Sequence, residues 1–218
     1  MKALALVRCC AVWITLLLAP PAAALDAFAG ALPWDRLASA HPGEWAEYAM
    51  RAEGRVTGPW LRFLVVGPAA GGEGIWLEVW ISSRPGSATQ AWRMLLTGDP
   101  AAPGGVARLI GRSFGGPSRA LELPPPEEPV QGPPGAGAAR WIAGEDETLL
   151  TEAGSIRARS ASLYREGVLL ARSWVAPAVP VFGLVRLELQ GGGGLELHAW
   201  GRAGRGVVDP AAASGIEP

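Results

Sequence analysis

The chain has 218 residues and a formal net charge of −1, and charges of both signs are spread along it. This length predicts one domain, or one domain with an insertion, and the absence of a basic block gives no sign of a nucleic-acid partner. The two cysteines, Cys9 and Cys10, lie near the N-terminus, so the rest of the chain has no residue for disulfides, thiol catalysis or cysteine-bound metal.

A signal peptide is predicted over residues 1–24. Lys2 and Arg8 precede an apolar run at Cys9–Ala19, and small residues follow at Ala22–Ala24. A charged start, a short apolar core and an Ala-x-Ala cleavage site are typical of secretion signals, and the run is too short to span a bilayer comfortably. The alternative is an uncleaved membrane anchor. Cleavage would bring the net charge to about −3 and release a periplasmic or secreted protein with no stable membrane span.

Strand patterns dominate the first half of the mature chain. A short helical segment is expected at Asp35–Ala40, and from Trp45 onward apolar residues recur with period two between turns rich in Gly, Pro and Ser. The expected strands are Trp45–Gly54, Trp60–Val66, Ile75–Ser83, Trp92–Gly98 and Val106–Phe114.

A proline- and glycine-rich segment, 123–139, interrupts the strands and is predicted to be a loop inserted in one domain; a boundary between two domains is the alternative. Tight connections at Arg165–Gly167 and Gly191–Gly194 predict hairpins. Residues 205–218 are expected to form a flexible tail. The strands expected after the insertion are Thr148–Gly154, Ser155–Arg165, Val168–Val175, Leu184–Gln190 and Leu195–Gly201.

The stretch Val168–Leu189 organises this second half. Two strands rich in Val and Leu flank Pro177 and Pro180, which cannot lie inside a paired central strand. We therefore predict an all-β fold with minor helix: a single domain over residues 25–204, with about ten strands in a curved antiparallel sheet or unclosed barrel.

One strand face combines tryptophans with charges. In Ile75–Ser83, the side chains of Trp76, Glu78 and Trp80 alternate with a plainly apolar face. One interpretation is a partly solvated surface on which indoles cover neighbouring strands and stack on arginines. The other is the lining of a concave apolar pocket, and it names five candidate ligand-binding residues. These are Trp60, Trp76, Trp80, Trp174 and Trp200.

Catalytic and metal motifs lack their usual context. Gly111–Gly115 fits the G-x-S-x-G pattern around Ser113, and Asp146 and His198 follow in the order of a serine hydrolase. No helix pattern follows the serine, so we expect no catalytic residues. No second histidine lies near His198 at ligand spacing, and no metal or cofactor is expected.

Several short motifs resemble uncharacterised periplasmic relatives of the lipoprotein-sorting carrier (LolA/LolB-like) superfamily. They are Gly43-Glu44-Trp45, Ala153-Gly154-Ser155, and Trp174 followed by Val179-Pro180 and Gly183-Leu184-Val185. The resemblance implies an unclosed, strongly curved antiparallel barrel that holds acyl chains or another apolar ligand, with no catalytic residue.

These observations lead to three functional hypotheses. The first is a non-enzymatic periplasmic or secreted protein that binds a hydrophobic ligand, such as a lipid or acyl chain, or a lipoprotein partner, in a half-open barrel. The second is a structural envelope module that uses its tryptophan face against another protein. The third is a secreted serine hydrolase.

Overall fold

The computed structural model describes residues 32–98, 105–113, 115–121 and 139–208. The predicted signal peptide, almost all of the 123–139 insertion and residues 209–218 lie outside these ranges. Within them, no helix is long and apolar enough to cross a membrane. The predicted all-β fold is confirmed, because nearly every described element is an antiparallel strand.

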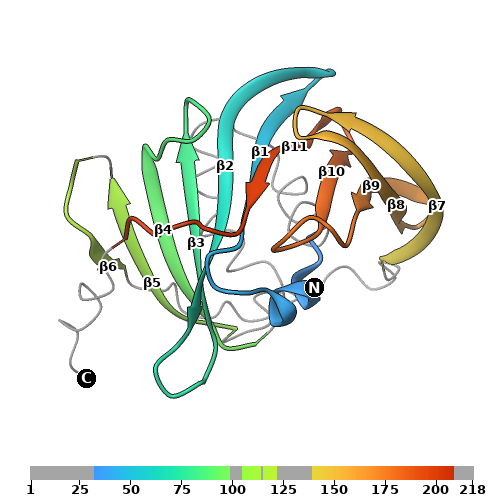
Figure 1. The fold of residues 1–218 in the computed structure, drawn as a ribbon. Coiled ribbons are helices and arrows are strands. Elements are labelled where there is room, and N and C mark those ends of the chain that lie inside the picture. Colours follow the sequence, from blue (N-terminus) through green and yellow to red (C-terminus); the bar gives the residue numbers. More distant parts are fainter. Residues whose placement is uncertain (1–31, 99–104, 114, 122–138, 209–218) are drawn as a thin grey trace.

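A single sheet of eleven strands forms the described domain (Figure 1). Its order is β6-β5-β4-β3-β2-β1-β11-β10-β9-β8-β7, so two meanders meet where β1 pairs with β11. No pairing joins the end strands β6 and β7 within the described ranges, and the sheet curves without closing. The elements are η1 (Trp34–Ser39), β1 (Trp45–Ala52), β2 (Arg55–Pro68), β3 (Ile75–Ser82), β4 (Gln90–Leu96), β5 (Val106–Ser113), β6 (Arg119–Leu121), β7 (Arg140–Thr151), β8 (Gly154–Arg165), β9 (Val168–Val175), β10 (Leu184–Leu189) and β11 (Gly193–Gly201).

Two tight turns of the same kind connect β1 to β2 and β8 to β9. Glu53 and Gly54 have φ of 50° and 77°, and Glu166 and Gly167 have φ of 52° and 79°. Two consecutive positive φ values match the right-handed twist of the flanking strands, and glycine at the second position adopts them without strain. The hairpin predicted at Arg165–Gly167 is confirmed.

Two strands, β2 and β7, extend furthest beyond their predicted bounds. The strand expected to begin at Trp60 is β2, which starts at Arg55 and continues through Gly58 and Pro59, where a shift in the pairing with β1 absorbs the proline. The strand expected to begin at Thr148 is β7, which starts at Arg140. Its first half carries little apolar alternation, because most of its side chains are exposed.

The main core lies on the inner face of the sheet, defined here as the face that carries Tyr48 and Phe63. Their rings belong to an edge-to-face series that continues to Phe182 and then to Trp34 of η1, with centroid distances of 5.0 to 5.9 Å. Phe182 comes from the β9–β10 connection, Ala176–Gly183, and is fully buried. This connection and η1 therefore fill the curve of the sheet (Figure 1).

Two residues of this core show its depth. Tyr48 is fully buried and its hydroxyl has no hydrogen-bond partner, so burial raises the pKa of the phenol well above its ordinary value. Val181, next to Phe182, has a φ of 66°, which is strained for a β-branched residue. The connection accepts this backbone conformation while it places Phe182 in the core.

Candidate functional site

The register of the sheet places the five predicted indoles on two faces. Trp60, Trp76 and Trp80 lie on the face opposite the main core, which we call the outer face. Trp174 is connected to Trp60 by a series of cross-strand pairs, but it is buried as a member of the main apolar core. Trp200 pairs with Ala46 on the inner face and is 39% exposed. The series that connects Trp174 to Trp60 runs through Arg186, Glu196 and Ala49.

Arg62 stacks between two indoles on the outer face. Its guanidinium carbon lies 4.2 Å from the ring centroid of Trp45 and 4.9 Å from that of Trp80. Glu47, only 2% exposed, accepts hydrogen bonds from Arg62 and from the backbone amide of Gly86. The charge and the indoles therefore hold each other in place, as in the arginine-stacking interpretation of this face.

A buried ion pair lies beside this stack. Glu78 is fully buried and accepts hydrogen bonds from Nε and Nη2 of Arg93, at 3.0 and 2.8 Å, and from Nε1 of Trp80, at 2.6 Å. The backbone amide of Val207 donates a further bond of 2.6 Å to the same carboxylate. Val208 is buried against Trp80 in a second apolar cluster. Residues 205–208, the start of the predicted tail, thus lie against the outer face and cover part of it.

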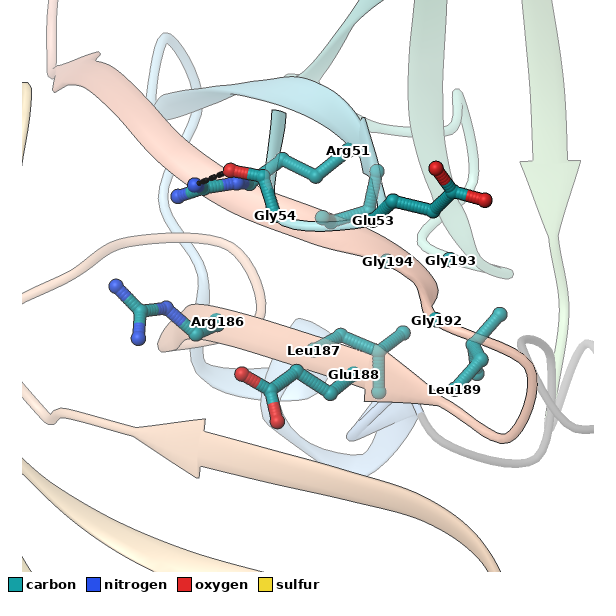
Figure 2. A pocket seen from close by; sticks show the side chains of 11 residues that line it. Arg51, Glu53, Gly54, Arg186, Leu187, Glu188, Leu189, Gly192, Gly193 and Gly194 are labelled. Carbon is teal, nitrogen blue, oxygen red and sulfur yellow. Dashed lines mark hydrogen bonds between the residues drawn. The ribbon is translucent and has the colours of Figure 1, made fainter. Parts of the chain in front are cut away.

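A pocket of about 360 Å³ lies near the turns that end the β1–β2 and β10–β11 hairpins (Figure 2). Gly192–Gly194 bring no side chains to it, and Arg51 and Arg186 line it from two different strands. None of the five predicted indoles lines this pocket, and their role in ligand binding stays a prediction. The lining residues are Arg51, Glu53, Gly54, Arg186, Leu187, Glu188, Leu189, Gly192, Gly193, Gly194 and Leu195.

A shared carboxylate connects the two arginines of this pocket. Glu196 accepts from Nη1 of Arg51 at 2.5 Å and from Nη2 of Arg186 at 2.6 Å. Arg51 also donates to the carbonyl oxygen of Gly54, which fixes its guanidinium against the β1–β2 turn. From the sequence alone, only the glycine-rich β10–β11 turn and the charge of Arg51 could be identified as features of this pocket. The convergence of strands β1, β10 and β11 on one carboxylate depends on their register, which sequence reasoning missed.

Trp174 pairs with Arg186 across strands β9 and β10 and is 3% exposed. Guanidinium carbons of Arg172 and Arg186 lie 4.5 and 5.9 Å from its ring centroid. Two buried donor atoms here have no hydrogen-bond partner, Nε1 of Trp174 and Nε of Arg186. Buried donors without acceptors are rare in folded proteins, because each forfeits the bond that it made with water.

The three residues of the serine-hydrolase pattern have separate surroundings. Ser113 ends β5, near one end of the sheet order, and Asp146 lies in β7 at the other end. His198 bonds through Nδ1 to the carboxylate of Glu152, and its ring contacts Trp60 at a centroid distance of 4.4 Å. The structure therefore pairs the histidine with a carboxylate other than that of Asp146.

The acidic run Glu145–Glu147 is largely neutralised by arginines of neighbouring strands. Asp146 accepts hydrogen bonds from Arg159 and Arg157, and Glu147 accepts from Arg172. The hydrogen bond from Arg159 is the main reason why the pKa of Asp146 lies below its usual value. Over the described ranges, no three His, Cys, Asp or Glu residues are grouped closely enough to hold a metal ion.

Comparison with known proteins gives structural likenesses only. No family model and no curated protein matches the chain. Three solved structures resemble it at 8 to 12% identity. One is a candidate exported protein with a YMCC-like fold from Bacteroides fragilis (12% identity, 74% of this chain and 98% of that chain, TM-score 0.36). The others are a candidate lipoprotein from Parabacteroides distasonis (10%, 73% and 95%, TM-score 0.32) and a DUF1329 family protein from Desulfovibrio piger (8%, 89% and 96%, TM-score 0.31). Because these TM-scores and identities are low, no function is assigned from them.

Proposed function

We propose that the mature protein is a non-enzymatic protein of the bacterial envelope that binds a hydrophobic ligand, or the lipid of a lipidated partner, on the inner face of its open sheet. The envelope localisation is inferred from the predicted signal peptide over residues 1–24. The observation that carries the binding proposal is the cover of the inner face. Among the described elements, a short 3₁₀ helix and one loop cover an apolar surface to which nearly all strands contribute.

This cover is small enough for a ligand to replace. The β9–β10 connection buries Val179, Val181 and Phe182 in the main core. Burial of such side chains stabilises by about 1.5–3 kcal/mol each. An acyl chain gains about 0.8 kcal/mol for each buried methylene, so ten methylenes would gain about as much as the three side chains lose. Displacement of the loop by a lipid is therefore close to balanced in free energy.

Native mass spectrometry tests the proposal. Residues 25–218 are purified from a bacterial periplasm, stripped of lipid, and incubated with sodium oleate or with phosphatidylglycerol in mild detergent. We expect a saturable one-to-one adduct. Absence of any adduct, together with recovery of a stable complex with another protein, would contradict the proposal and favour the structural envelope module instead.

The variant Phe182→Ala provides a prediction about the mechanism. Removal of the ring should destabilise the protein by about 3–5 kcal/mol and should increase the affinity for oleate, because the loop then competes less well for the inner face. Urea unfolding and a fluorescent fatty-acid displacement assay measure the two effects.

The matched control for Phe182→Ala is Ile110→Ala. Ile110 is fully buried, but it belongs to the second apolar cluster on the outer face. This variant should lose stability without a gain in affinity for oleate. An equal gain in both variants would mean that oleate binds loosened protein in general, and binding on the inner face would then be wrong.

A further inference from the structure

Residues 204–208, which we call the tail segment, cross the outer face of the first half of the sheet without pairing as a strand (Figure 1). Gly204 lies against Leu64 of β2, and Arg112 of β5 donates to the carbonyl oxygen of Val207. Neighbouring strands lie about 4.8 Å apart and a residue reaches at most about 3.6 Å, so a segment that spans β2 to β5 in four residues must be nearly extended. The outer face thus holds a short stretch of extended peptide.

Side chains of the sheet bind the backbone of this segment. Oε1 of Glu78, in β3, accepts a hydrogen bond of 2.6 Å from the amide of Val207. Nη1 of Arg112, in β5, donates to the carbonyl oxygen of the same residue. Both backbone groups of one residue are therefore held from two strands. Where peptides are recognised in this way, as in strand addition to a sheet edge, main-chain hydrogen bonds provide affinity and side-chain pockets provide specificity.

Two positions of the tail segment are restricted in side-chain size. A Cβ placed on Gly206 would overlap with Nη2 of Arg93 and Oε2 of Glu78, so this position accepts only glycine without a shift of the buried ion pair. Two residues later, Val208 is 2% exposed and is buried against Trp80 in the second apolar cluster. The surface therefore selects a glycine followed, two positions on, by a small aliphatic residue.

The buried charges of this surface remain paired when the tail segment leaves. Glu78 still accepts two hydrogen bonds from Arg93 and one from Nε1 of Trp80. Nε of Arg112 still donates to the carbonyl oxygen of Gly116. The tail segment contributes chiefly its backbone hydrogen bonds and the burial of one valine. A second peptide with the same few features can replace it.

We propose that this surface is a binding site for an extended peptide of another protein, one with a glycine two residues before a small aliphatic residue. The tail segment occupies the site within the same chain and is displaced by that peptide. The bound tail segment itself shows the chemistry that the site accepts. The site is on the outer face, opposite the main core, so it does not depend on lipid binding at the inner face.

Fluorescence anisotropy with a labelled peptide of residues 203–208 tests the proposal. The protein is residues 25–218, either unaltered or with Gly206→Ala or Val208→Asp, two changes that release its own tail segment. We expect saturable binding to both variants and at least tenfold weaker binding to the unaltered protein, because its own tail segment competes for the site. The matched control is a peptide in which the glycine at position 206 is alanine, and it should not bind.

No saturable binding to either variant, or equal binding of the two peptides, would overturn the proposal. If neither variant folds, the unaltered protein answers the same question with the peptide in large excess, since competition weakens binding without abolishing it. Light scattering of the unaltered protein should show a monomer. A dimer that Gly206→Ala dissociates would mean that two copies exchange their tail segments, and occupation of the site within one chain would then be wrong.

A second pair of variants locates the site. In the Gly206→Ala protein, Arg112→Gln should weaken binding of the peptide about tenfold, because a hydrogen bond from a charged group is lost. Arg108→Gln is the matched control, since Arg108 is an exposed arginine four residues earlier on β5, and it should change binding less than twofold. Equal binding by the two variants would overturn the assignment of the site to this surface.

Discussion

The two halves of the sheet use the same side-chain pattern with different outcomes. In β1–β5, arginine, glutamate and tryptophan on the outer face form a satisfied network, in which Glu78 alone accepts from Arg93, Trp80 and the backbone of Val207. In β9–β11, the same residue types leave two buried donors without acceptors and border an open pocket. The comparison teaches that the same residue types form a satisfied network only where the register brings each donor to a carboxylate.

The largest expected effect comes from breaking the satisfied half. Glu78→Gln leaves the guanidinium of Arg93, itself 6% exposed, without a counter-charge. We expect a loss of about 3–5 kcal/mol in the free energy of unfolding, because an unpaired buried charge is costly. Urea unfolding measures it. A loss below about 1 kcal/mol would mean that water compensates the charge, and the two halves would then differ less than the structure indicates.

The second effect concerns the segment that covers the satisfied half. A chain that ends at Gly206 loses the amide bond from Val207 to Glu78 and the burial of Val208. Together these should cost about 2–4 kcal/mol of stability. A chain that ends at Val208 is the control, since it keeps both contacts and should unfold like the full mature protein. Equal stability of the two truncated chains would show that this cover contributes nothing.

A pair of tryptophan variants sharpens the comparison further. Trp80→Phe removes a hydrogen bond to the Glu78 carboxylate, whereas Trp174→Phe removes an N–H that has no acceptor. Both changes remove similar volume, so Trp80→Phe should cost about 1.5–3 kcal/mol more than Trp174→Phe, the value of a hydrogen bond to a charged group. Thermal unfolding of both variants gives the difference. Equal losses would imply that Trp174 has a partner in solution.

The smallest effect is at the exposed edge of the second half. Hydrogen bonds from Arg159 and Arg157 lower the pKa of Asp146, so its contribution to stability is present above the ordinary pKa of an aspartate and is lost as pH falls through the lowered value. In Arg159→Gln, the pKa of Asp146 should rise toward its ordinary value, as followed by NMR of the carboxyl carbon. An unchanged pKa would show that Arg157 alone suffices.

The strands that could be predicted from sequence are those with one buried face. In β3, the alternation of Leu77 and Val79 with charged and aromatic neighbours gives the strand and its two faces directly. The first half of β7 lacks such alternation, because its backbone pairs with β8 while most of its side chains stay in water. Its extent therefore could not be predicted from local pattern.

The ion pairs of the candidate site could not be predicted from the sequence for a related reason. Arg62 meets Glu47, and Arg93 meets Glu78, because each hairpin brings together residues fifteen positions apart. Arg51 meets Glu196 across 145 positions, where the first and last strands pair. Period-two patterns assign a side chain to a face but do not fix which residue of a distant strand lies opposite it.

The pairing of β1 with β11 has a consequence for the folding of the nascent chain. Trp45 finds its partner Gly201 only after almost all of the protein has been synthesised, so the first meander carries an incomplete edge until then. Contacts between such distant segments slow folding, because the long intervening chain must first be brought together. The sheet can therefore be completed only after strand β11 has been synthesised.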